Sequence, residues 1–286
     1  MVKDTLNYPK SSLNLGGILT PFDVPLVMGI INATPDSFYE NSRLTSVDAV
    51  LKVAEDMLAS GVDIIDIGGY SSRPGASQVD ENEEQRRVIP LIVAILKRFS
   101  QVKISVDTFR SKVADECLQH GAVMINDISA GNLDEKMFEI VAKNNASYCM
   151  MHMRGNPQTM MEDLTYVNLI QDILLYFSNK INQLKALGVT NIILDPGFGF
   201  SKSTQQNFEL LNNLGQLKVL NLPLLVGLSR KSMIYKTLEI DAVKSLNGTT
   251  VLNTIALQQG ASILRVHDVT EAKEAIKLLE AIKQSS

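Results

Sequence analysis

The sequence predicts an α/β protein, a (β/α)8 TIM barrel in a single domain with an N-terminal capping hairpin. Three observations support this prediction. The chain has 286 residues, a length that single α/β barrels commonly reach. Short apolar runs alternate with amphipathic stretches along the chain, which is the pattern of a parallel sheet covered by helices. Eight such runs occur, and eight parallel strands close a barrel.

The residues before the first apolar run are expected to form an N-terminal extension, 1–24, and the barrel domain is expected over 25–286. Gly16 and Gly17 fit the turn of a small hairpin, because glycine adopts the backbone angles that tight turns require. This hairpin would cap the bottom of the barrel.

Each predicted strand is a continuous apolar run rather than an alternating one, as strands buried on both faces are. The alternative is a doubly wound open sheet, but no G-x-G-x-x-G motif follows the first strand, as nucleotide-binding sheets of that kind require. The predicted strands are 27–31, 64–67, 103–106, 123–125, 148–151, 192–194, 224–227 and 263–266.

The stretches between these runs have the periodicity of amphipathic helices. Gly61 and Gly188 stand directly after two of them, and glycine is the usual helix stop. The predicted helices are 46–60, 83–99, 111–120, 134–144, 166–187 and 269–283.

Composition excludes several classes of function. A net charge of −4 with a pI of about 5.5 argues against a nucleic-acid partner, which usually requires clustered basic residues. No apolar run approaches the roughly 20 residues of a membrane span, and the N-terminus lacks the apolar stretch of a secretory signal. Cys117 and Cys149 lack metal-binding spacing. They are expected to be buried, reduced thiols, which fits a cytoplasmic location.

The segment NIILDPGFGFSKS (191–203) contains glycines, a lysine and a serine, but it is not a P-loop. That motif needs four residues between its glycines and a Gly-Lys-Ser/Thr ending, whereas Gly197 and Gly199 are separated by one residue and Ser201 precedes Lys202. The segment instead predicts a buried strand that delivers the carboxylate of Asp195 to a loop.

Polar residues follow every predicted strand. In a (β/α)8 barrel the active site lies at the carboxyl ends of the strands, so these residues are expected to converge there. They are Asn32, Asp66, Ser72, Arg73, Asp107, Asn126, Asp127, His152, Asp195, Ser229, Arg230, Lys231, Arg265 and His267.

Several of these residues have a plain structural interpretation. Asp107 could cap the helix that begins near Ser111, and Asn126 could satisfy loop backbone; for both, the structural and functional interpretations remain open. His152 stands among methionines and is interpreted as a structural histidine, and Arg230 as a solvated or ion-paired helix residue.

The cations at the strand ends form a second group. Arg73, Lys231, Arg265 and His267 bring positive charge into an acidic protein, which suits an anionic group such as phosphate. With three histidines, no H-x-H motif and no cysteine pair, a transition-metal site is not expected. Mg²⁺ is compatible, because it can use one protein oxygen, with Asn32 as the natural donor, together with phosphates and water.

These motifs resemble those of the dihydropteroate synthase family, the pterin-binding TIM barrels of folate biosynthesis. The matching blocks run in the family's order from about residue 26 to the C-terminus, and together they are highly specific. They are MGIINATPDSF (28–38), DIGGYSSRPGA (66–76), ISVDTFRSKVA (104–114), INDISAG (125–131), MMHMRGNPQTM (150–160), ILDPGFGFSKS (193–203), VGLSRKSMI (226–234) and LRVHDV (264–269).

The resemblance implies a transferase that condenses p-aminobenzoate with 6-hydroxymethyl-7,8-dihydropterin diphosphate and releases pyrophosphate. The implied pterin pocket comprises Asp107, Asn126, Asp195 and Lys231. The implied diphosphate pocket comprises Asn32, Arg73, Arg265 and His267, with Mg²⁺ at Asn32. The implied p-aminobenzoate site, at which sulfonamides compete in the family, comprises Ser72, Arg73, Pro74, Phe200 and Ser229.

The implied mechanism breaks the C–O bond before the amine attacks. Lys231, Arg265, His267 and Asp107 are the implied catalytic residues. The first loop is expected to close over the site as a lid that contains Thr34, Pro35, Asp36, Ser37 and Phe38. A homodimer formed through the last helices is also implied.

The sequence departs from the family pattern in the first two loops. Ser72 replaces the usual threonine, Tyr70 stands where a glutamate or a small residue is more common, and YENS follows TPDSF. These departures bear on affinity for p-aminobenzoate and sulfonamides. Two alternatives to the synthase are a methyltransferase from methyltetrahydrofolate to a corrinoid, which shares the fold, and a non-catalytic pterin-binding protein.

Overall fold

The computed structural model describes residues 12–33, 43–70 and 79–285. Within these residues, eight strands form one parallel sheet whose order is β8-β7-β6-β5-β4-β3-β10-β9. The strands are β3 (Leu26–Asn32), β4 (Ile64–Gly68), β5 (Lys103–Asp107), β6 (Met124–Asp127), β7 (Ser147–Met151), β8 (Ile192–Asp195), β9 (Leu225–Val226) and β10 (Ile263–Val266).

The two ends of this sheet meet, so the sheet closes into a barrel. A parallel bridge links Leu194 in β8 to Leu224 just before β9, and the Leu194 amide donates to the Pro223 carbonyl at 2.9 Å. The predicted (β/α)8 fold is therefore confirmed, and the open-sheet alternative is excluded.

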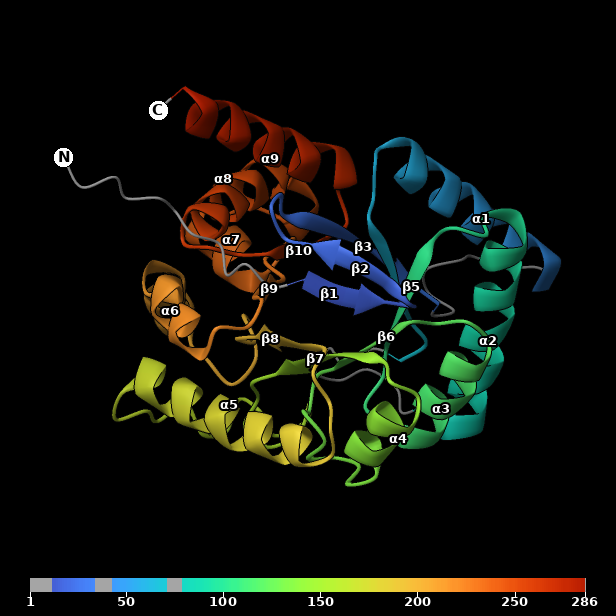
Figure 1. Ribbon diagram of the computed structural model, residues 1–286. Coiled ribbons are helices and arrows are strands. Elements are labelled where there is room, and N and C mark those ends of the chain that lie inside the picture. The colour runs from blue at the N-terminus through green and yellow to red at the C-terminus, as the bar shows by residue number, and fades with distance from the viewer. Residues whose placement is uncertain (1–11, 34–42, 71–78, 286) are drawn as a thin grey trace.

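Helices surround the barrel on its outer face (Figure 1). They are α1 (Arg43–Ala59), α2 (Glu81–Arg98), α3 (Ser111–Gln119), α4 (Met137–Lys143), α5 (Leu169–Ala186), α6 (Thr204–Asn212), α7 (Ser232–Thr237), α8 (Leu246–Gln258) and α9 (Val269–Gln284), with 3-10 turns η2 (Leu214–Leu220) and η3 (Ala242–Lys244). In the described parts of the chain, no helix has the length and apolarity to cross a membrane.

The sequence did not predict α6, α7 or α8. The first has a clear start signal, a capping box between Ser203 and Gln206. By contrast, α7 has only six residues, too few to establish a period. The buried face of α8 includes Thr249 and Asn253, so this helix lacks the regular apolar stripe that identifies a helix in sequence.

Successive residues in each strand face opposite sides of the barrel wall. One set, which includes Ile65, Val106 and Leu264, belongs to the large core cluster between the strands and the helices. The other set, which includes Ile64 and Met124, belongs to a second cluster inside the barrel. Because both sides of the wall are apolar, the strands read as continuous apolar runs.

An antiparallel hairpin closes the amino-terminal end of the barrel, as predicted. It consists of β1 (Ser12–Leu15) and β2 (Ile18–Pro21), and it lies across the middle of the ring of helices (Figure 1). Its turn uses Gly16 and Gly17, with φ angles of 64° and 89°. The boundary placed at residue 24 between this extension and the barrel domain remains a prediction.

The hairpin is anchored by packing and by hydrogen bonds. Leu13 and Leu15 are buried in the same cluster as the inward residues of the strands. The Asn14 amide donates to Asn191 at 3.2 Å, and the Asn14 carbonyl accepts from the Ser147 hydroxyl at 2.8 Å. The hairpin thus completes the lower half of the interior core.

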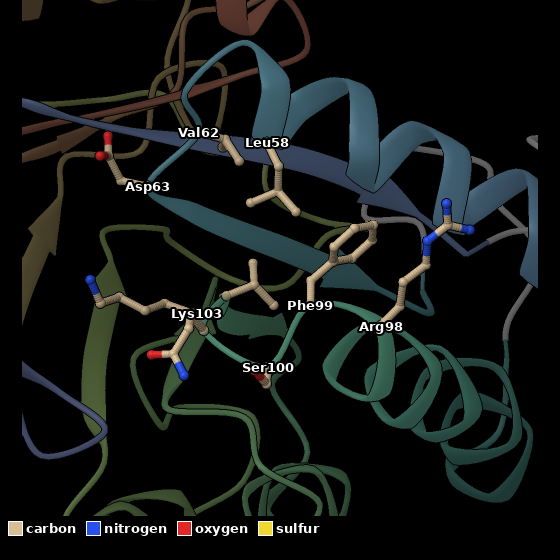
Figure 2. A pocket seen from close by; sticks show the side chains of 9 residues that line it. Leu58, Val62, Asp63, Arg98, Phe99, Ser100 and Lys103 are labelled. Atoms are coloured by element: carbon tan, nitrogen blue, oxygen red, sulfur yellow. The ribbon is translucent and has the colours of Figure 1, made fainter.

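A surface pocket of about 540 Å³ lies at this same end of the barrel (Figure 2). Its lining includes Asp63 and Lys103, which stand at the starts of β4 and β5. Asp63 already accepts from the Val27 amide and from the Lys273 ammonium. The pocket lies at the amino ends of the strands, where barrels are built for stability rather than catalysis.

We expect the substitution Leu15→Ala to lower the free energy of unfolding by about 2–5 kcal/mol, because it removes a buried side chain and leaves a cavity. Leu15 is 1% exposed, whereas Leu19 in the same hairpin is 69% exposed. Leu19→Ala is therefore the matched control, with an expected change within about 0.5 kcal/mol. Urea unfolding measures both; similar losses would contradict the capping role of the hairpin.

Candidate active site

The polar residues of the candidate site stand directly above the apolar core of the barrel. In four strands, a polar residue follows an inward apolar residue by two positions and therefore faces the same side. The four pairs are Ile64 and Asp66, Met124 and Asn126, Ile193 and Asp195, and Ile263 and Arg265. Asp107 belongs to the same group of residues, because in the strand register it lies between Asn126 on one side and Gly68 on the other.

Arg265 connects the carboxylates of two neighbouring strands. Its Nε donates to Asp66 Oδ2 at 2.7 Å, and its Nη2 donates to Asp107 Oδ2 at 2.6 Å. Burial opposes the charge of Arg265, but the two carboxylates more than compensate and raise its pKa. The predicted diphosphate residue Arg265 and the predicted pterin residue Asp107 are thus in direct contact.

Asp66 lies at the centre of this arrangement, whereas its sequence position predicted only that it would stand among the polar residues at the strand ends. It is completely buried, and its Oδ2 also accepts from Asn126 Nδ2 at 3.1 Å. Its Oδ1 has no hydrogen-bond partner among the described residues. The amide of Asn126 is therefore held by a carboxylate, which decides against its alternative interpretation as a loop residue.

Asp107 is not a helix cap. The amide of Ser111, the first residue of α3, donates to Asp134 Oδ2 at 2.7 Å, so a different carboxylate performs that role. Burial raises the pKa of Asp107 to about 7, while the nearby charge of Arg265 opposes this rise.

Asp195 ends β8 and is buried. Its Oδ1 accepts from the Gly197 amide at 2.8 Å. Burial raises the pKa of Asp195, and the Gly197 hydrogen bond and the charge of Lys231 oppose this effect. The charges of Arg265 and Lys202 also lower this pKa, so Asp195 and Arg265 belong to one electrostatic unit at one mouth of the barrel.

The loop after β8 brings Phe200 beneath Lys231. The Lys231 Nζ lies 4.4 Å from the centroid of the Phe200 ring, a cation–π distance. Gly199 makes this approach possible: its φ is +79°, and a Cβ there would lie 3.2 Å from Lys231 Cδ. A predicted pterin residue and a predicted p-aminobenzoate residue are therefore adjacent.

Ser229 and His267 also lie together. The Ser229 hydroxyl and His267 Nδ1 are 2.9 Å apart, and the His267 amide donates to the same hydroxyl at 3.3 Å. Arg230, between Ser229 and Lys231, bonds Asp268 instead, with its Nη2 at 2.6 Å from Oδ1. This confirms the interpretation of Arg230 as an ion-paired residue.

His152 and Lys202 form a buried pair that the sequence did not predict. His152 is 2% exposed and lies edge-on to Tyr176, with ring centroids 4.9 Å apart. Burial, helped by the charge of Lys202, lowers the pKa of His152 to about 2. The Lys202 Nζ lies 3.0 Å from His152 Nδ1. A buried lysine beside a helix start has no signature in the sequence.

Asp127 holds a loop. It accepts from the Ser129 amide at 2.7 Å, the Gly131 amide at 2.8 Å and the Tyr148 hydroxyl at 2.7 Å. These contacts satisfy both of its oxygens, so it belongs to the support of the site.

Part of the predicted site lies outside the described residues. This applies to the lid residues Thr34, Pro35, Asp36, Ser37 and Phe38 and to Ser72, Arg73 and Pro74. Tyr70, the last described residue before the second loop, contacts Phe109 edge-on, with ring centroids 5.3 Å apart.

The described residues offer few side chains that could bind a metal ion. Over residues 12–33, 43–70 and 79–285, no group of three His, Cys, Asp or Glu side chains could hold a metal. Asn32 ends β3 with an exposed side chain, so its amide oxygen is a single accessible ligand. That set fits Mg²⁺ bound mainly through phosphates and water, and it does not fit a zinc site.

Comparisons with known proteins agree with this geometry. Residues 28–267 match the family model described as pterin binding enzyme. Dihydropteroate synthase of Escherichia coli K12 is 43% identical over 90% of this chain and 91% of that protein.

Two solved structures are similar over almost their full length. The Yersinia pestis dihydropteroate synthase in complex with a sulfonamide drug has a TM-score of 0.89 at 41% identity, covering 96% of this chain and 99% of that one. The Xanthomonas albilineans dihydropteroate synthase with 4-aminobenzoic acid has a TM-score of 0.89 at 34% identity, covering 96% and 98%.

The low pKa of His152 predicts a stability that falls with acidity. Burial keeps this pKa at about 2, against 6.5 for a free histidine, so between these values only the unfolded chain binds the proton. Stability from this residue is then complete above pH 6.5 and is lost as the pH falls. We expect a loss of about 1.5 kcal/mol in the free energy of unfolding between about pH 6.5 and pH 5.

Urea unfolding across this pH range, applied to wild type and to His152→Gln, measures this contribution. The glutamine retains an acceptor for Lys202 but does not titrate, so its stability should depend less steeply on pH. His120→Gln, at an exposed histidine, is the control. Parallel curves for wild type and His152→Gln would show that the histidine is not buried in its neutral form.

Proposed function

The chain belongs to the pterin-binding enzyme family and is a transferase of the dihydropteroate synthase class, and we propose the details of its reaction. It condenses p-aminobenzoate with 6-hydroxymethyl-7,8-dihydropterin diphosphate to give 7,8-dihydropteroate and pyrophosphate. The observation that carries this proposal is the pair of carboxylates at the barrel mouth, Asp66 and Asp107, with Arg265 between them.

Asp195, Asn126, Asp107 and Lys231 form the pterin pocket. The 2-amino group and the N3–H of the pterin are two adjacent donors, and one carboxylate can accept both bonds. Asp195 suits this role because its orientation is fixed by the Gly197 amide. Asn126 both donates and accepts, and Lys231 can reach O4 and N5 of the ring.

The leaving diphosphate binds near Arg265 and His267, with Asn32 from the end of β3 and Arg73 from the second loop. Arg265 uses Nε and Nη2 for Asp66 and Asp107, but a guanidinium has five N–H donors. Within the described part of the chain, the remaining donors have no other hydrogen bond, so they can bind an anion. Arg265 would then serve both the pterin carboxylates and the leaving group.

The p-aminobenzoate site comprises Phe200, Ser229 and the second-loop residues Ser72, Arg73 and Pro74. In support, Phe200 lies beside Lys231 and Ser229 beside His267, so this site borders both other pockets. The relatives that were solved with 4-aminobenzoic acid and with a sulfonamide make the same site the expected sulfonamide target here.

Mg²⁺ is the proposed cofactor, held by Asn32 and by the diphosphate. When bound, it neutralises the charge that develops on the departing pyrophosphate. The single accessible amide oxygen of Asn32 fits this mode of binding.

The residues of the chain carry the remaining chemistry. The arylamine is neutral at pH 7, so its attack needs no strong general base. The C–O bond breaks first, and its electron pair leaves with pyrophosphate. The amine nitrogen then bonds the cationic methylene carbon and loses a proton. Arg265 and His267 stabilise the departing anion, and Asp107 faces the cation.

We also propose a homodimer and a cytoplasmic location. Val251 on α8 and Leu278 and Ile282 on α9 are apolar and at least half exposed, and such a surface suits an interface between copies. Cys117 and Cys149 are both buried and unbonded, which agrees with a reducing compartment.

Neither alternative function accounts for the site as well. A corrinoid methyltransferase requires carboxylates for the pterin but no anion pocket. A non-catalytic protein requires no arginine between a buried carboxylate and a partly buried one, because removing such charges from water costs free energy.

We expect the purified protein to release pyrophosphate only when both substrates and Mg²⁺ are present. Asp195→Asn should abolish this activity at moderate substrate concentration and weaken pterin binding by about 2–5 kcal/mol, the range for truncating one partner of a buried charged hydrogen bond. An enzyme-coupled pyrophosphate assay and calorimetry with 6-hydroxymethylpterin measure the two effects.

The control is Asp163→Asn, because the side chain of Asp163 is 69% exposed and should not affect catalysis. Methyl transfer without pyrophosphate would favour the corrinoid enzyme, and binding without turnover would favour the non-catalytic protein. Unchanged pterin affinity in Asp195→Asn would remove Asp195 from the pterin pocket.

A further inference from the structure

Lys202 is a buried cation that the proposed mechanism does not use. It is 2% exposed and stands in the loop that connects β8 to α6. Its Nζ lies 3.0 Å from His152 Nδ1 and donates to the carbonyls of Gly197 at 3.1 Å and of Phe200 at 3.0 Å. Three acceptors therefore surround one ammonium group, which has three N–H donors.

Each of the two carbonyls belongs to a part of the candidate site. The Gly197 amide donates to Asp195 Oδ1, so Lys202 and Asp195 bind opposite ends of the backbone at Gly197. The Phe200 carbonyl belongs to the residue whose ring lies beneath Lys231. Lys202 thus connects the residue that anchors the pterin edge to the residue that borders p-aminobenzoate.

The backbone of this loop is tightly packed at Gly197, where a side chain would not fit. Gly197 has a φ of +76°, and a Cβ at this position would lie 2.1 Å from the His152 carbonyl. The His152 amide in turn donates to the Asp195 carbonyl at 2.9 Å. The end of β7, the end of β8 and the following loop are therefore packed around the Lys202 ammonium.

The charge of Lys202 acts on the same carboxylate. Burial lowers the pKa of Lys202 to about 7, the charge of Asp195 at the end of β8 opposes this effect, and Lys231 before α7 and Arg154 in the loop after β7 add to it. His152 is the neutral partner of Lys202. Asp195 is the one acid in this set. Burial raises the pKa of Asp195, and the positive charge of Lys202 opposes this rise.

We propose that Lys202 is a positioning residue for the pterin pocket, which orients Asp195 and Phe200 through the loop backbone and favours the ionised form of Asp195. This inference rests on the proposed function, because it assumes that Asp195 accepts hydrogen bonds from a pterin. Lys202 itself does not touch substrate; it acts through the loop and through its charge.

The test is the pH dependence of 6-hydroxymethylpterin affinity, measured by calorimetry for wild type and Lys202→Met. The variant should bind at least about tenfold more weakly at neutral pH, a loss within the range for interactions of buried charges. Without the ammonium, Asp195 takes up a proton more readily. The acid limb of the affinity profile should therefore move to higher pH, and a loop that is merely loosened would not move it.

Asn207→Ala is the matched control. The Asn207 side chain is buried in α6 and accepts from the Gly199 amide at 2.7 Å, so its loss loosens the same loop without changing a charge. Its acid limb should coincide with that of wild type. Lys202→Gln, which keeps N–H donors but no charge, provides a second variant if Lys202→Met does not fold, and its acid limb should also move.

An unmoved acid limb in a folded Lys202 variant, or an equal movement in Asn207→Ala, would overturn the proposal. Pyrophosphate release by wild type is measured separately. Its absence would refute the synthase reaction, whereas wild-type turnover combined with unchanged pterin binding in the Lys202 variants would refute only the role of Lys202.

Discussion

The ion pairs of Arg265 with Asp66 and Asp107 hold the mouth of the barrel together. Asp66 and Arg265 are separated by 199 positions in the sequence, and β3 lies between their strands in the sheet. Asp66 is completely buried, and Asp107 is partly exposed, with 24% of its side chain accessible. Two neighbouring carboxylates repel each other and resist ionisation, and the cation between them offsets this repulsion. Asn126 extends the same network to β6. The charge of Arg265 also lowers the pKa of Asp195. The candidate site is therefore one electrostatic unit rather than a collection of independent ligands.

The barrel separates stability from chemistry along its axis. At the amino ends of the strands, inward side chains such as Ile64 and Met124 pack against the hairpin. Two residues further along four of these strands, the inward side chains are the polar Asp66, Asn126, Asp195 and Arg265. The free energy gained by burying the apolar layer and the outer core balances the cost of holding ionisable groups in the interior at the other end. This arrangement explains why one end carries the capping hairpin and the other carries the candidate site.

Much of this architecture could be predicted from the sequence, because it depends on local patterns. The eight apolar runs and the glycine pair of the hairpin are local signals, and the strand-end polar residues follow from the rule that barrel sites form there. The pairing of those residues could not be predicted. Asp107 and Asn126 each had two interpretations. Only the structure shows that Arg265 bonds Asp107 and that Asp66 accepts hydrogen bonds from both Arg265 and Asn126. Lys202 was unremarkable in sequence because burial depends on how the loop folds around it. The short α7 and the partly polar buried face of α8 escaped prediction for lack of a regular period.

The claim that Arg265 and the carboxylates act as one unit is tested most directly by a double-mutant cycle. The variants are Asp66→Asn, Arg265→Gln and the two combined, and the quantity is the binding free energy of 6-hydroxymethylpterin from calorimetry. If the unit exists, the combined loss is smaller than the sum of the single losses, with a coupling free energy of at least about 1.5 kcal/mol, within the range for residues in one network. Losses that add to within about 0.5 kcal/mol would mean that the two residues act independently, and would contradict the account.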